Sequence, residues 1–152
     1  MPDRSAVSSV PAAHLGLCWL LLACSQDVDE QAVSFVDVSE KAGLVFTHFN
    51  GARGDYLYPE TMGSGAAFFD FDADGNLDLY LLNGAELAGD SADPAPVNHL
   101  FRNLGDGTFA DVSRGSGVAD ASYGTGCAAG DADGDGDSDL FITAVGPNRL
   151  FR

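Results

Sequence analysis

The hydrophobic residues of this 152-residue chain come mostly in short runs that are separated by Gly, Asn and Asp. Runs of about four to six apolar residues bounded by such turn formers are typical of β-strands. One segment, 39–43, is compatible with a single helical turn in which Ser39 is the cap and Gly43 ends the turn. A second segment, LGDG at 104–107, predicts a hairpin of the Asp-Gly type. The pattern therefore predicts an all-β fold with almost no helix.

The chain also repeats parts of its own sequence in the same order. FVDVS at 35–39 recurs as FADVS at 109–113, MGSGAA at 62–67 as YGTGCA at 123–128, and NHLFR at 98–102 as NRLFR at 148–152. Repeats of this size, built from short strands, are typical of propeller blades, each of which is a four-stranded sheet. The spacing between repeats differs mainly because of segment 84–97, which is rich in Ala, Asp and Pro and is expected to form a surface loop.

Two acidic segments, 70–78 and 131–139, carry the same pattern, D-x-D-x-D-G-x-x-D. Their carboxylates repel one another unless a hard cation collects them, and Ca²⁺ takes six to eight oxygens. Side chains at positions 1, 3, 5 and 9 can converge on one point, and the glycine at position 6 allows a tight bend. The expected ligands are Asp70, Asp72, Asp74 and Asp78, with Asn76 offering its carbonyl, and Asp131, Asp133, Asp135 and Asp139, with Asp137 in the carbonyl role. The sequence thus predicts two calcium sites.

Two other interpretations of these loops fit the residues less well. An EF-hand needs a bidentate Glu at position 12 and flanking helices, whereas position 12 here is Leu81 or Ile142 and the flanks are β-like. Solvated Asp-Gly turns would suit a single turn between strands, but they do not account for nine Asp in two matching registers. Asp106, in a third Asp-Gly pair, is expected to be a turn former because the other ligands are missing.

Composition limits the classes of partner. The chain holds 23 acidic and 7 basic residues, for a formal net charge of −16, and Lys41 is its only lysine. Phosphate binding needs clustered Lys and Arg, so nucleic acid is not expected as a partner. A hydrophobic content of 45% is too high for a disordered chain.

The N-terminus has the pattern of an export signal. An apolar stretch at 10–22 leads into LLACS at 21–25, which resembles the bacterial lipobox, whose cysteine is acylated. We therefore expect a signal peptide at 1–23, lipid on Cys24, a linker at 24–32 and the folded repeats at 33–152. The alternatives are an ordinary signal peptide, giving a secreted protein, or a short membrane anchor, although about 13 apolar positions are too few to span a bilayer.

Cysteine usage agrees with this arrangement. Cys18 would leave with the signal, Cys24 would carry lipid, and Cys127 would remain alone, so no disulfide framework is expected. Cys127 lies in a run of small residues, where a buried structural thiol is favoured over a nucleophile.

The motifs resemble those of known families. YG at 123–124, GD at 130–131 with the loop that follows, DLFI at 139–142 and VGP at 145–147 resemble the FG-GAP repeat of integrin-α-type β-propellers and the related bacterial VCBS repeats. FVDVSEKAGL at 35–44, PETMGSG at 59–65 and NHLFRNLGDGTF at 98–109 are similar to the beginning of cartilage acidic proteins of the ASPIC/UnbV type. The resemblance covers about 33–152. It implies a seven-bladed propeller with Ca²⁺ in hairpin loops at the blade edges, found in secreted or surface proteins of adhesion and recognition.

Two functions follow from these expectations. The first is a non-enzymatic, lipid-anchored interaction module that binds a protein or glycan and uses Ca²⁺ as a structural ion, with no catalytic residues. The second is an enzyme, or its accessory domain, acting on extracellular polysaccharide, but Asp55, Glu60 and Glu86 have no recognisable carboxylate partner in the sequence. Two repeats and a first partial strand do not close a ring, so we interpret the sequence as an N-terminal fragment.

Overall fold

A computed structural model describes residues 33–87 and 94–152 of the chain. The chain divides into two units, 1–36 and 37–152, and the fold described below is that of the second unit. The proposed signal peptide at 1–23, Cys24 and the whole of the 24–32 linker lie outside the described residues.

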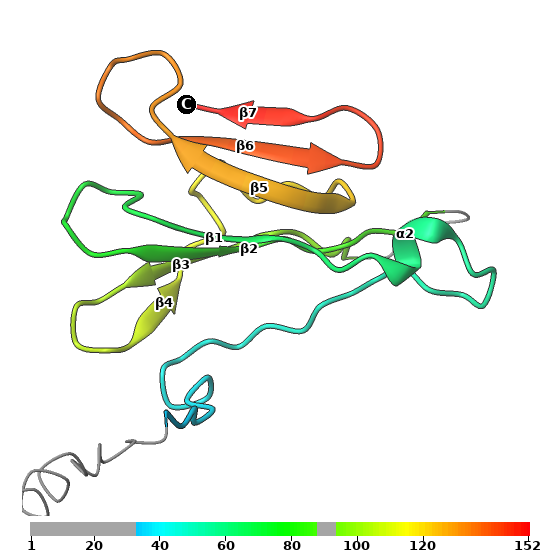
Figure 1. Cartoon of the computed structure of the whole chain (residues 1–152), viewed down its shortest axis with the longest axis horizontal. Helices are drawn as coiled ribbons and strands as arrows, with labels where there is room; N and C mark the ends of the chain where they lie inside the picture. The colour runs from blue at the N-terminus through cyan, green and yellow to red at the C-terminus, as the bar shows by residue number, and fades with distance from the viewer. Residues whose placement is uncertain (1–32, 88–93) are drawn as a thin grey trace, which may run out of the picture. The chain divides into compact units, whose positions relative to one another are not determined.

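The second unit consists of two antiparallel sheets (Figure 1). The first contains β1 (Ala66–Phe69), β2 (Asp78–Leu81), β3 (His99–Asn103) and β4 (Phe109–Asp111) in sequence order. The second contains β5 (Gly124–Gly130), β6 (Asp139–Ala144) and β7 (Arg149–Phe151), also in sequence order. The only described helix is α2 (Tyr58–Thr61), a single turn. The prediction of a nearly all-β fold is therefore confirmed.

The sheets follow the repeats found in the sequence. In the first sheet Phe69, the last residue of β1, pairs with Asp78, the first residue of β2. The 70–78 segment is therefore the loop between these two strands. In the second sheet Gly130 at the end of β5 pairs with Asp139 at the start of β6, so the 131–139 segment is the loop between β5 and β6. Each acidic segment is thus the loop of the first hairpin of its sheet, as the β-like flanks indicate.

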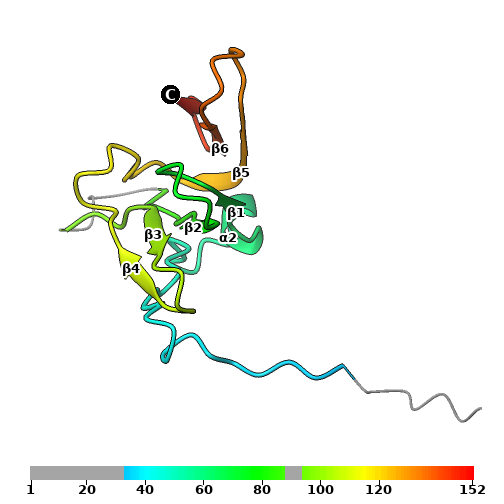
Figure 2. The same cartoon turned by 90° about the vertical axis from the view of Figure 1, so that its left-hand side faces the viewer.

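The core is shared by the two sheets. Tyr80, Leu82 and Leu100 from the first repeat form one buried cluster with Leu140 and Ile142 from the second. The strands that bring the sheets together are β1 and β5, which lie beside each other in both views (Figures 1 and 2). Burial of these apolar side chains stabilises the pairing of the two repeats.

The repeated glycines explain how the sheets approach so closely. Gly65 and Gly126 occupy the same position in the MGSGAA and YGTGCA repeats, and they lie against each other. A Cβ atom on Gly65 would stand 2.9 Å from the Cα atom of Gly126, which is closer than packed carbon atoms can lie. Any larger residue at position 65 would therefore push the two sheets apart.

Three local predictions can be compared directly. The 104–107 hairpin is confirmed: Leu104 N–H donates to the Thr108 carbonyl at 2.9 Å, and this turn connects β3 to β4. The turn at 39–43 is also confirmed, since Ala42 N–H donates to the Val38 carbonyl at 2.8 Å and Gly43 has φ +77°. Segment 35–39, which repeats the sequence of β4, is not a strand among the described elements.

Candidate metal centre

The two acidic loops bring the same three positions together. In the first loop carboxylate oxygens of Asp70, Asp72 and Asp78 all lie within 4.8 Å of one another. In the second loop the equivalent trio is Asp131, Asp133 and Asp139, within the same limit. Positions 1, 3 and 9 of the predicted ligand set therefore converge in both repeats.

The carboxylate at position 9 is buried in each loop and anchors it to the sheet. Asp78 is fully buried, and its two oxygens accept hydrogen bonds from Phe71 N–H at 2.8 Å and Asn103 N–H at 2.7 Å. Asp139 is 4% exposed and accepts from Ala132 N–H at 2.8 Å. A buried carboxylate is costly unless it is hydrogen-bonded or bound to a cation, so these bonds hold the side chain in place toward the cluster.

The carboxylate at position 1 organises the loop backbone. Asp70 accepts hydrogen bonds from the N–H groups of Asp74 at 3.1 Å and Gly75 at 2.9 Å. Asp131 accepts from Gly134 at 2.6 Å and Gly136 at 3.0 Å. These bonds require the sharp bend that positive φ angles give at position 6, where Gly75 has +89° and Gly136 has +97°.

The remaining predicted ligands lie outside the two carboxylate trios. At position 5, Asp74 and Asp135 each accept a hydrogen bond from the N–H group of position 7, which is Asn76 at 2.8 Å and Asp137 at 3.0 Å. Asp74 and Asp135 are not members of the two trios whose oxygens all lie within 4.8 Å of one another. Their coordination of a metal, and the carbonyl role of Asn76 and Asp137, remain predictions.

Two features of the loops were missed in the sequence. Position 4 also needs a left-handed backbone: Gly134 has φ +82° and Ala73 has φ +57°, which is strained for alanine. In addition, an arginine lies beside position 3 of each loop: Arg102 belongs to β3, and Arg152 directly follows β7. Arg102 lies 3.8 Å from Asp72 and Arg152 lies 3.2 Å from Asp133. Both arginines end the NHLFR and NRLFR repeats, a signal that comparison of the repeats could have revealed.

Other candidate groups are accounted for by ordinary structural roles. Asp106 accepts a hydrogen bond from Thr108 N–H at 2.9 Å, which confirms it as a turn former. Glu86 forms an ion pair with Arg53 at 2.8 Å. Cys127 is partly buried and packs against the core, and burial raises the pKa of its thiol, which disfavours the nucleophilic thiolate.

The chemistry of the two trios fits a hard divalent cation. Each offers only carboxylate oxygens, which suit Ca²⁺ and Mg²⁺ and do not suit metals that prefer sulfur or imidazole. Three converging carboxylates carry negative charge that a single arginine at position 3 does not balance. The clusters can therefore hold a metal ion.

Comparison with known proteins gives one family match. The model of the FG-GAP-like repeat matches residues 70–142, a span that begins at Asp70 and contains both acidic loops. No curated protein and no solved structure matches the chain. Within the described residues, no helix combines the length and apolarity that a membrane crossing would require.

Proposed function

We propose that this chain is a calcium-binding, non-enzymatic module of the β-propeller type that acts outside the cytoplasm in protein or glycan recognition. The observation that carries the proposal is the convergence of three carboxylates in each of two equivalent loops. The similarity of 70–142 to the FG-GAP-like repeat supports the propeller architecture, since the two sheets would then be successive blades.

Calcium is favoured over magnesium because of the ligand supply. Each nine-residue loop can offer carboxylates at positions 1, 3, 5 and 9 and a backbone carbonyl at position 7. Ca²⁺ accepts such irregular sets of six to eight oxygens, whereas Mg²⁺ demands a near-octahedral set and retains several waters. An ion surrounded by chain oxygens would fix the first hairpin of each sheet, so its role would be structural.

A cavity between the two loops is the place where a partner could bind. It has a volume of about 460 Å³ and lies between the first and second repeat. Its lining includes Asp70 and Asp137 from the loops and Phe71, Phe151 and Arg152. Metal binding would therefore shape this surface, which contains aromatic side chains and an arginine, the residue types that are enriched at recognition sites.

Titration of the full chain with Ca²⁺ tests the proposal. We expect two sites in the wild type, one site in Asp70→Ala and in Asp131→Ala, and none in the double variant, by isothermal titration calorimetry. Asp106→Ala is the matched control, because Asp106 stands in an Asp-Gly turn and belongs to neither carboxylate trio. Unchanged stoichiometry in the single variants would show that these loops do not bind calcium.

Location outside the cytoplasm depends on the N-terminal pattern. The LLACS segment at 21–25 supports lipid attachment at Cys24 and anchoring in a membrane. Metabolic labelling with a radioactive fatty acid in a bacterial host should mark the wild type and leave Cys24→Ser unlabelled. Equal labelling of the two proteins would contradict the lipoprotein assignment and favour an ordinary signal peptide instead.

A further inference from the structure

The first repeat contains an insertion that the second repeat lacks. GL at 43–44 is separated from MG at 62–63 by 17 residues, whereas the equivalent GV at 117–118 is separated from YG at 123–124 by four. The insertion leads into β1 and the first acidic loop leaves β1, so the two lie at opposite ends of the first sheet (Figure 1). In repeat proteins, insertions of this kind form loops on one face, which is often the binding face.

The insertion loop, residues 50–62, is tied together at its base by the second repeat. The Tyr123 hydroxyl donates to the Asn50 carbonyl at 3.0 Å and to the Pro59 carbonyl at 2.8 Å. Burial and the nearby Glu60 carboxylate raise the pKa of Tyr123, so its hydroxyl stays protonated and remains a donor. A surface loop whose two ends are held close together has the architecture of an Ω-loop, and such loops are frequently functional.

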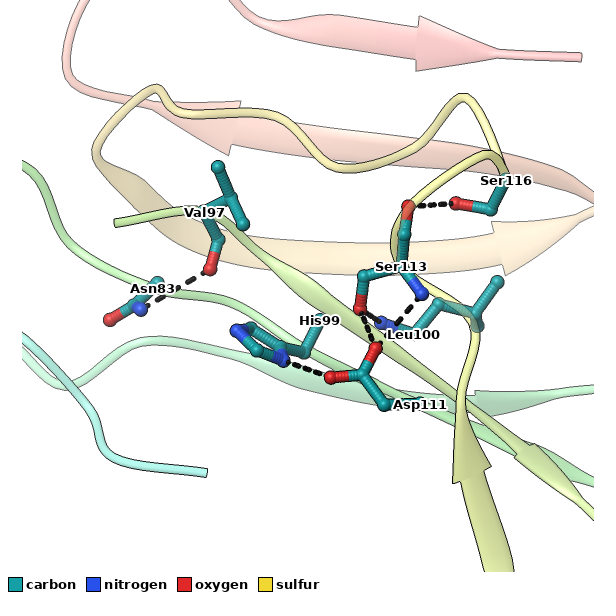
Figure 3. Close-up of polar contacts among 7 residues, drawn as sticks. All are labelled: Asn83, Val97, His99, Leu100, Asp111, Ser113 and Ser116. Carbon is teal, nitrogen blue, oxygen red and sulfur yellow. Dashed lines mark hydrogen bonds and ion pairs between the residues drawn. The ribbon is translucent and has the colours of Figure 1, made fainter. Parts of the chain in front are cut away.

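Further contacts attach the insertion loop to the first sheet. The Phe49 N–H, directly before the loop, donates to Asn83 Oδ1 at 2.7 Å. Asn83 is itself held in place, because its Nδ2 donates to the Val97 carbonyl at 3.2 Å (Figure 3). Within the loop, Arg53 Nε lies 2.8 Å from Glu86 Oε2. These contacts give the loop a defined position at its end of the sheet.

The tip of the insertion loop presents aromatic side chains to solvent. Tyr56 is 87% exposed, Tyr58 is 75% exposed, and Leu57 between them is 38% exposed. Tyr56 also has φ +53°, a left-handed conformation that is unfavourable for a bulky residue. Strained residues of this kind cluster at functional sites, and tyrosine is enriched where proteins recognise one another. Because neither the exposure nor the strain stabilises the fold, both indicate that the tip binds a partner.

Charge determines the kind of partner that fits this tip. Asp55 is exposed next to Tyr56, and Glu60 follows in α2, while Arg53 is engaged by Glu86. Guanidinium and ammonium groups bind to the faces of tyrosine rings and pair with carboxylates. The net charge of −16 on the whole chain attracts cationic partners and repels anionic polysaccharides and anionic membranes.

We propose that the insertion loop binds a basic segment of a partner protein, with arginine or lysine side chains stacked on Tyr56 and Tyr58 and paired with Asp55. This proposal rests on the recognition role proposed above and adds the chemistry of the partner. It also places a binding surface apart from the cavity beside the acidic loops, since that cavity contains no residue of the insertion loop. Tyrosine and glycine together on a loop are typical of surfaces that bind proteins.

Binding of synthetic peptides to the full chain tests the proposal. The probes are fluorescent peptides of Gly and Ser that carry two arginines at varied spacing, with matched peptides in which citrulline replaces arginine. By fluorescence anisotropy in millimolar calcium, we expect binding of arginine peptides only. The double variant Tyr56→Ala/Tyr58→Ala should weaken it by about tenfold, and Asp55→Asn by about threefold. Phe68→Ala, at an aromatic residue of β1 that is 62% exposed, and Asp106→Asn are the matched controls and should leave binding unchanged.

Three outcomes would overturn the proposal. Neutral oligosaccharides, cellohexaose and laminarihexaose, are tested in parallel. If they bind the wild type and not Tyr56→Ala/Tyr58→Ala, the loop recognises a glycan. Peptide binding that is equal in loop variants and controls would show charge attraction without a site, and the absence of any peptide binding would refute the site outright. Calcium titration of the same variants should still give two sites, so a failure of calcium binding is measured separately from a failure of this loop.

Discussion

The Tyr80 hydroxyl donates a 2.6 Å hydrogen bond to the Val118 carbonyl. Tyr80 belongs to β2 and is fully buried, while Val118 lies in the connection that leads from the first sheet to the second. Burial raises the pKa of Tyr80 above its usual value, so the hydroxyl stays protonated and remains a donor. This bond holds the connecting segment against the core and therefore helps to keep the two repeats packed together.

Tyr80→Phe should lower the free energy of unfolding by about 0.5–1.5 kcal/mol. The substitution keeps the ring but removes one buried hydrogen bond, while the Val118 carbonyl still accepts from Asp120 N–H at 2.9 Å, so the loss is that of one net hydrogen bond. Urea unfolding followed by circular dichroism measures the difference. Tyr56→Phe, at a side chain that is 87% exposed, is the control and should stay within about 0.5 kcal/mol of the wild type. Equal stability of the two variants would contradict a structural role for the Tyr80 bond.

Asp120 should make stability depend on acid pH. Partial burial alone would raise the pKa of Asp120, but hydrogen bonds from Ser122 and the Arg149 guanidinium outweigh burial and hold this pKa below 3.8. Because the folded pKa is depressed, the carboxylate stabilises the fold above 3.8, and the contribution disappears as the pH falls through the folded pKa. Asp120→Asn should therefore melt at a lower temperature than the wild type at pH 7, and the gap should close in acid.

The comparison of melting curves for Asp120→Asn needs an exposed reference. Asp55→Asn removes one negative charge from an exposed turn and corrects for the change in net charge. The difference in melting temperature between Asp120→Asn and the wild type should shrink as the pH falls. If this difference stays constant down to the most acid pH at which the protein is folded, the stabilising role of the Asp120 carboxylate is refuted.

The sequence was sufficient where structure is decided by neighbouring residues. Turn formers such as Gly105 and Gly107, both with positive φ, end β3 and begin β4 where the pattern predicts a hairpin. The acidic loops were also predictable, because their first and last residues flank paired strands. In both cases the determining information lies within about ten residues of chain.

The sequence was insufficient where structure depends on a distant partner. Phe35 and Phe109 begin nearly identical segments, yet only the second pairs with a strand, since pairing requires an available edge. The α2 turn that contains Pro59 was missed because four residues are too few to show helical periodicity. Ala73 gave no sign of its positive φ, since the residue type favours the opposite conformation.

Calcium should stabilise the fold in proportion to its occupancy of the two loops. An ion that binds only the native state adds RT ln(1 + [L]/Kd), or about 2.7 kcal/mol per site at 100 times Kd. We therefore expect a higher melting temperature in millimolar calcium than in EGTA, with half of the shift remaining in Asp70→Ala. The double variant Asp70→Ala/Asp131→Ala should melt at one temperature in both buffers. A wild type that melts equally in the two buffers would refute a structural role for calcium.

Arg102→Gln should raise the affinity of the first loop for calcium. Arg102 lies 3.8 Å from Asp72, so its guanidinium competes with a cation for that carboxylate and repels the cation as well. Exposed ion pairs of this kind contribute about 0.2–1 kcal/mol, which corresponds to a rise in affinity of up to about fivefold. Titration in an Asp131→Ala background isolates the first site. Arg149→Gln is the matched control, because Arg149 pairs with Asp120 at 3.1 Å, away from the carboxylate trios, and should leave the affinity unchanged. If Arg102→Gln weakens binding instead, the arginine supports the metal-bound loop, and the competition between guanidinium and calcium for Asp72 is refuted.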